Sequence, residues 1–217
     1  MIQDAHRLRQ GIYRLLSAGF GPVSTDFLAA ADGSIDVLDG LGIFDYAYAP
    51  DVVTALGRFA EPDADELRIA YVELFEIGVD GVPCQLRESA HLGDSRTGEV
   101  ALIQSELRHC YERYGVSFDA DQPDQVDHVS TELGAMASLC AMTVDRVAGH
   151  GGDSTLGHQS DLLTEHVLCW VPQLTREMLA VECHPAYSAL ARATLGFLEH
   201  ERQHLPILAA QDAAPAQ

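Results

Sequence analysis

Acidic and histidine side chains come close together at one place in the chain. Asp127 and His128 precede a long amphipathic run, and Glu132 follows one helical turn later. A carboxylate beside a histidine is a combination used in acid–base catalysis, but neighbouring residues on a helix point about 100° apart. Asp127 and His128 therefore do not orient each other, whereas His128 and Glu132 have a spacing that allows pairing. We interpret this place as a helix start or as part of a binding surface, not as a catalytic dyad.

Other motifs that carry chemistry are missing or weak. The chain contains no nucleophile elbow, phosphate-binding loop, H-E-x-x-H zinc motif or dinucleotide fingerprint. His200 and His204 have the spacing of two metal ligands on one helix face, and His166 lies three residues before Cys169. We interpret both pairs as structural or solvated side chains. A helical metal- or cofactor-binding protein that uses His200 and His204 stays open as the alternative function, whereas the favoured prediction is a protein with no catalytic residues, metal or cofactor.

A long irregular segment, residues 78–98, follows a helix that ends in Leu74 and Phe75. A segment of roughly this length without secondary structure is unusual inside a compact domain and often functional. One interpretation is a structural loop held by Glu88 at the N-terminus of a neighbouring helix. The other is the wall of a groove for an extended peptide, in which exposed Leu74 and Phe75 form apolar pockets and carboxylates bind arginines.

Helices must position these residues, because apolar side chains recur three and four positions apart and no strand pattern interrupts them. The clearest stripe runs from Val129 to Val147, with Asp124 as the expected N-cap. The sequence predicts an all-α fold, a single compact domain of about eight to ten helices over residues 1–205, and a disordered tail over residues 206–217. Further helices are expected at 4–18, 35–41, 99–114, 161–181 with a kink at Pro172, and 185–205, and after Ser24, Pro50 and Asp63.

The amino-acid composition limits the kinds of molecule that the protein is expected to bind. The formal net charge is −20, and all 13 basic residues are arginines. Such acidity argues against nucleic acid and anionic membrane, and fits a basic partner or a high-salt cytoplasm. No apolar run approaches the roughly 20 residues of a membrane span, and the five scattered cysteines indicate a reduced, cytoplasmic protein. The glycine-rich link at 149–157 leaves a monomer or a domain-swapped homodimer open.

Several short motifs occur in a familiar order between Leu67 and Leu205. They resemble the TorD/DmsD/NarJ family of cytoplasmic chaperones dedicated to molybdenum enzymes. The motifs are Tyr71-x-x-Leu74-Phe75, Pro83, Glu88-Ser89, Tyr114-Gly115, Pro123, Asp127-His128, Glu132-Leu133, Glu165-His166-x-x-Cys169-Trp170-x-Pro172, Tyr187-x-x-Leu190-Ala191 and Phe197-Leu198.

The resemblance implies an all-helical, non-enzymatic protein. It further implies binding of the twin-arginine signal peptide, or the N-terminal region, of an apo-molybdoenzyme, which is held until its molybdopterin cofactor is inserted and before export. Transferred to this sequence, the client-binding residues would be Tyr71, Leu74, Phe75, Pro83, Glu88, Ser89, Pro123, Asp127, His128 and Glu132.

Overall fold

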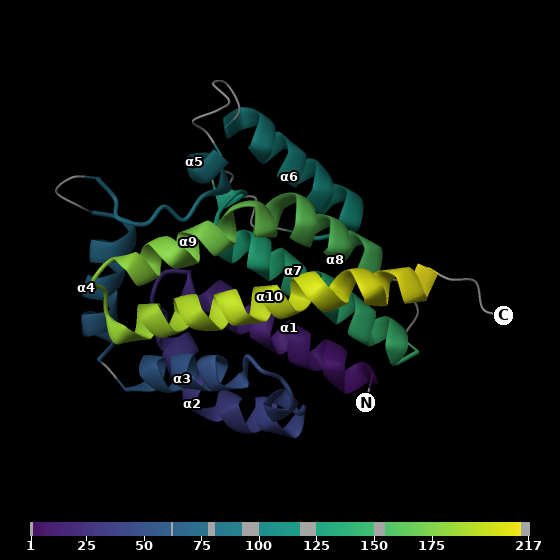
Figure 1. The fold of residues 1–217 in the computed structure, drawn as a ribbon, viewed down its shortest axis with the longest axis horizontal. Coiled ribbons are helices and arrows are strands. Elements are labelled where there is room, and N and C mark those ends of the chain that lie inside the picture. Colours follow the sequence, from purple (N-terminus) through teal and green to yellow (C-terminus); the bar gives the residue numbers. More distant parts are fainter. Residues whose placement is uncertain are drawn as a thin grey trace.

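The structure is a computed structural model that describes residues 2–61, 63–77, 81–92, 100–117, 125–149 and 155–213. Within these ranges the chain forms ten α-helices and no strand (Figure 1), so the predicted all-α class is confirmed. Pro123 and Asp124 lie outside the described residues, as do parts of the segment 78–98. No helix among the described residues is long and apolar enough to cross a bilayer.

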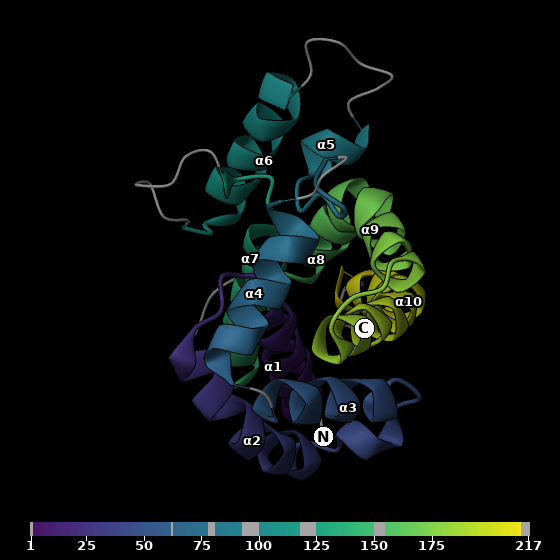
Figure 2. The ribbon, with the colours of Figure 1, turned by 90° about the vertical axis from the view of Figure 1, so that its left-hand side faces the viewer.

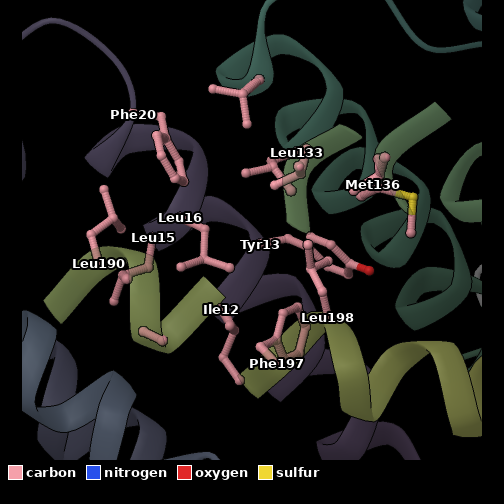
Figure 3. Close-up of a cluster of buried hydrophobic side chains, with 14 of the residues drawn as sticks. Ile12, Tyr13, Leu15, Leu16, Phe20, Leu133, Met136, Leu190, Phe197 and Leu198 are labelled. Atoms are coloured by element: carbon pink, nitrogen blue, oxygen red, sulfur yellow. The ribbon is translucent and has the colours of Figure 1, made fainter. Parts of the chain in front are cut away.

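Three helices form the centre of the molecule: α1 (Ile2–Gly19), α7 (Val129–Val147) and α10 (Pro185–Ala213). Helix α1 packs most extensively on α7, and its apolar stripe also meets α10. Figure 3 shows this core, in which Ile12, Tyr13 and Leu16 from α1 lie among side chains of α7 and α10. The pattern of apolar residues three and four apart therefore predicts this part of the fold well.

Helices α2 (Thr25–Gly40) and α3 (Ala49–Ala60) lie side by side at one edge of the molecule, with the short 3₁₀ turn η1 (Ile43–Asp45) between them in sequence (Figure 2). Ser24 caps α2 as expected, by accepting a hydrogen bond from the backbone N–H of Asp26. The sequence predicts separate helices after Ser24 and at 35–41, which is wrong, because α2 is continuous through Gly33. An interior glycine costs a helix only about 1 kcal/mol, and Leu38 beyond it is buried.

Helix α4 (Ala64–Phe75) begins at Asp63, whose carboxylate accepts from the N–H of Asp65 at 2.9 Å. After α4 the segment 84–88 leads into α5 (Glu88–Leu92), so the expectation of a fully irregular 78–98 segment is wrong for residues 88–92. Helix α6 (Val100–Tyr114) then ends at Gly115, which has a φ of 69° and gives the left-handed stop that the sequence predicts.

The C-terminal part consists of α8 (Leu156–Leu162), a π-helical turn η4 (Leu163–Val167), α9 (Leu168–Ala180) and α10. The chain bends at η4 rather than at the predicted Pro172, which lies inside α9 (Figure 1). A π-turn is itself a recognised cause of a bend.

Helix α10 ends at Ala213, not at Leu205, so the expected disorder is wrong for residues 206–213. Leu205 is buried and Leu208 packs on the core, so the apolar stripe continues beyond Pro206. An ion pair between Asp212 and Arg146 of α7 also holds this last part of the helix.

Candidate functional site

The predicted site residues divide into a buried carboxylate cluster and an apolar helix end. We use the name carboxylate cluster for Glu88, Asp127 and Glu132, whose side chains are 2%, 0% and 0% exposed. They come from α5, the segment before α7, and α7 itself. The structure thus brings together three acids that are far apart in the sequence, and buries all of them.

A short backbone pairing aligns these segments. The N–H of Glu88 donates to the carbonyl of Asp127, and the N–H of Val129 donates to the carbonyl of Leu86, both at 2.9 Å. Arg87 and His128 form the isolated antiparallel bridge between the two segments. The segment that precedes α5 is therefore fixed against the start of α7.

Asp127 is the most heavily hydrogen-bonded member of the cluster. Its carboxylate accepts from the hydroxyl of Ser89 at 2.5 Å and from the side chains of Arg87 and Gln104, both at 3.2 Å. Arg87 is partly exposed, so its guanidinium connects the buried acid to the surface. Asp127 thereby holds α5 and α6 at the start of α7.

Glu88 and Glu132 have one aromatic partner each. Nδ1 of His166 lies 3.1 Å from the Glu88 carboxylate, and the indole N–H of Trp170 donates to Oε2 of Glu132 at 3.1 Å. The other oxygen of Glu132, Oε1, is buried and has no hydrogen-bond partner in the described structure. Burial raises the pKa of Glu132 well above its ordinary value, and the nearby charges of Glu88 and Asp127 raise it further.

His128 has a capping role instead of the predicted contact with Glu132. Its Nδ1 accepts from the backbone N–H of Ser130 at 3.2 Å, so His128 is the N-cap of α7, and the expected N-cap Asp124 lies outside the described residues. Burial, and to a smaller extent the charge of Arg87, lower the pKa of His128 to about 4. His128 is therefore neutral at pH 7, which the accepting Nδ1 requires.

Leu74 and Phe75 lie at the C-terminal end of α4 and are 4% and 7% exposed. The expectation that this pair is exposed is wrong, because the rings of Phe75 and Tyr71 pack against each other and against Tyr187 of α10. The carbonyl of Leu74 accepts from the N–H of Cys84 at 3.1 Å, which ties the helix end to the segment that carries Glu88. Although buried, Leu74 lines a surface groove together with the exposed Pro83.

Sequence reasoning missed the partners of the carboxylates. A buried indole N–H such as that of Trp170 normally requires an acceptor, and this requirement was the available signal for Glu132. His166 was considered as a metal ligand with Cys169, but its Nδ1 faces Glu88. Arg87 and Gln104 gave no signal, because their contacts depend on the pairing of distant segments.

The geometry gives the metal alternative no support. The rings of His200 and His204 stack with their centroids 4.0 Å apart, and Nδ1 of His204 meets the carbonyl of His200. The ring of His200 also packs edge-on against Tyr46 and Tyr48. In the part of the chain that the structure describes, no group of three or more histidine, cysteine, aspartate or glutamate side chains is arranged to hold a metal ion.

A family model described as "Nitrate reductase delta subunit" matches residues 45–176, which include the whole carboxylate cluster. The chain belongs to this family. The resemblance to TorD, DmsD and NarJ is thus confirmed at the level of the family.

Proteins of this family that resemble the chain are named chaperones. The chaperone protein TorD of Aeromonas salmonicida is 29% identical over 56% of this chain and 53% of its own length. The chlorate reductase assembly chaperone of Ideonella dechloratans is 28% identical over 59% and 62%. The selenate reductase assembly chaperone of Thauera selenatis is 27% identical over 65% and 71%. The chain spans about half the length of the TorD chaperones of Aeromonas salmonicida and Vibrio cholerae that it matches.

A solved structure is also similar. It is described as a proposed redox enzyme maturation protein of Archaeoglobus fulgidus, is 23% identical, and superposes with a TM-score of 0.49 over 88% of this chain and 93% of its own.

Proposed function

We propose that this protein is a cytoplasmic assembly chaperone for a molybdenum-dependent reductase. It binds the twin-arginine leader or the N-terminal region of the apo-enzyme and holds the client until the molybdopterin cofactor is inserted, before export. The observation that carries the proposal is the family match over residues 45–176, together with relatives named as assembly chaperones of chlorate and selenate reductases. The net charge of −20 suits a basic leader.

The predicted binding residues would divide between two roles. Pro83 is exposed and Leu74, although only 4% exposed, lines the same groove, so we propose that both contact the client directly. Tyr71 and Phe75 would hold the end of α4, because their rings lock it to α10. The remaining described residues, Glu88, Ser89, Asp127, His128 and Glu132, would position the segment 84–89 and would not touch the leader.

Titration calorimetry with the twin-arginine leader peptide of a molybdenum-dependent reductase from the same organism tests the function. We expect saturable binding that weakens when both leader arginines are changed to lysine, because a guanidinium binds a carboxylate in two places and an ammonium does not. Absence of saturable binding to both the leader and the complete apo-enzyme would contradict the proposal.

The contact role of Pro83 needs a variant that stays folded. Phe75→Ala is unsuitable, since removing a buried phenylalanine costs about 3–5 kcal/mol of stability and would weaken binding indirectly. Pro83 is exposed, so Pro83→Ala should cost no more than about 1 kcal/mol of stability, through the greater freedom of the unfolded chain, and should weaken leader binding several-fold. Unchanged affinity would remove Pro83 from the contact surface.

A further inference from the structure

A surface groove of about 420 Å³ lies between α4 and the turn that joins α9 to α10. Figures 1 and 2 agree that α4 lies beside this turn at one end of the molecule. The hydroxyl of Tyr187 donates to the carbonyl of Leu67 at 3.2 Å, which fixes the start of α10 against α4. The groove is therefore bordered by two anchored elements.

The floor of the groove is apolar and partly open to solvent. Ile69 of α4 is 60% exposed, and Val181 in the facing turn is 37% exposed. Ala70, Leu74 and Pro83 complete the apolar lining. Exposed aliphatic side chains that gather in a hollow favour an apolar occupant.

The two sides of the groove carry carboxylates. Glu66 and Glu73 lie on α4 seven residues apart, two turns along the same helix face, and Glu182 lies in the opposite turn. The ring of His184 lies 3.3 Å from Glu66. No arginine among the described residues forms an ion pair with Glu73 or Glu182.

The charges that line the groove indicate what kind of ligand it can bind. The groove combines an apolar floor with carboxylates on both sides, so its best partner carries guanidinium groups next to apolar residues. In an extended chain, successive side chains point to opposite sides. Two adjacent arginines in that conformation would therefore reach Glu73 on one side and Glu182 on the other.

We propose that this groove binds an extended segment with two adjacent arginines followed by apolar residues. The arginines pair with Glu73 and Glu182, and the apolar residues cover Ile69 and Val181. This inference rests on the proposed function, because it identifies the segment as the twin-arginine part of the client's leader.

The test uses the full chain, the leader peptide and a designed 12-residue peptide with an arginine pair before four leucines. Binding is measured by titration calorimetry at low and high salt. The groove variant is Glu73→Gln/Glu182→Gln. The matched control is Glu106→Gln/Glu112→Gln, which removes the same charge from exposed acids on α6.

We expect the groove variant to bind both peptides at least ten-fold more weakly, and the control to stay within two-fold of the wild type. The groove contribution should shrink at high salt, because exposed charge pairs are screened. Ile69→Ser should also weaken binding, through loss of the apolar contact.

Other results of these titrations distinguish failure of the proposed groove from failure of the proposed chaperone function. Leader binding that is equal in the groove and control variants overturns the groove and leaves the chaperone proposal standing. Binding of only the designed peptide, with dependence on Glu73 and Glu182, supports the groove as a site for an arginine pair and contradicts its assignment to the leader. Failure to bind either peptide overturns the groove, and the chaperone proposal falls with it only if the complete apo-enzyme also fails to bind. Equal binding of a peptide with alanines in place of its arginines overturns the charge pairing, because apolar contact would then suffice.

Discussion

Arg9 and Glu201 form a buried ion pair between α1 and α10, whereas the carboxylate cluster gathers three buried acids between α5 and α7. The Arg9 guanidinium donates twice to Glu201, with a shortest distance of 2.7 Å, and the hydroxyl of Tyr13 donates to the same carboxylate. Burial by itself lowers the pKa of Arg9, but the charge of Glu201 and the hydrogen bonds to it outweigh this effect and raise the pKa, so Arg9 is ionised. This pair is neutral as a unit and joins two helices that are distant in sequence.

The carboxylate cluster is not balanced in this way. Arg87 neutralises Asp127, but Glu132 has only the indole N–H of Trp170 and one buried oxygen without a partner. Buried charges without counter-charges are costly and tend to take up protons. The family model spans the cluster but neither Arg9 nor Glu201. The comparison indicates that the ion pair joins two helices without leaving excess charge, while the cluster leaves excess acidic charge buried beside the segment 84–89 that it is proposed to position.

Glu201→Ala removes one partner of the buried ion pair and should lower the free energy of unfolding more than any other variant proposed here. It leaves the Arg9 guanidinium buried without its carboxylate, which costs about 3–5 kcal/mol. Urea unfolding measures the loss. The control is the double variant Arg9→Met/Glu201→Leu, which removes both charges and should recover most of it. A single variant no less stable than the double variant would contradict a structural role of the pair.

Glu132→Gln tests whether the carboxylate cluster holds a protonated acid. A raised carboxyl pKa means that the folded state binds more protons than the unfolded state above pH 4.5, so wild-type stability falls as pH rises from there through the folded-state pKa. Glutamine removes this loss, and the variant should gain relative to wild type by up to about 1.4 kcal/mol per pH unit in that window.

The measurement is urea unfolding at several pH values between 5 and 9. Glu106→Gln, an exposed acid on α6, is the control and should show no such trend. A flat difference between Glu132→Gln and wild type would mean that Glu132 stays ionised in its buried position.

His128→Asn tests the neutral cap beside the cluster. Since the folded-state pKa is lowered to about 4, His128 contributes stability that is complete above pH 6.5 and is lost as pH falls towards 4. Over that pH interval the protein should lose about 2–3 kcal/mol of stability. Asparagine keeps the cap of α7 but does not titrate, so the variant should lose less stability between pH 6.5 and 4. Parallel curves for variant and wild type would show that His128 titrates normally.

How far the sequence could predict this molecule depends on the kind of interaction. The stripes of α1 and α7 are local, so their helices and buried faces were predictable, as was the Asp63 cap of α4. The pairing of segment 84–88 with 125–129 depends on tertiary structure. It places Asp127 beside Ser89, and the packing of α4 on α10, which is also tertiary, brings Phe75 to Tyr187. The groove was missed for the same reason, because Glu182 faces α4 only once α10 is folded back.

Arg68→Ala removes an exposed ion pair, serves as the reference for the buried pair, and should have the smallest effect on stability. Arg68 pairs with Asp65 at 2.6 Å on the exposed face of α4, where both side chains are about half or more exposed to water. Exposed pairs contribute about 0–1 kcal/mol because water and salt screen them, so Arg68→Ala should shift the urea midpoint only slightly, and less at high salt. The same truncation at Glu201 removes a charge from a site that water does not reach. If the Arg68→Ala and Glu201→Ala losses were similar, burial would not be what distinguishes the Arg9–Glu201 pair.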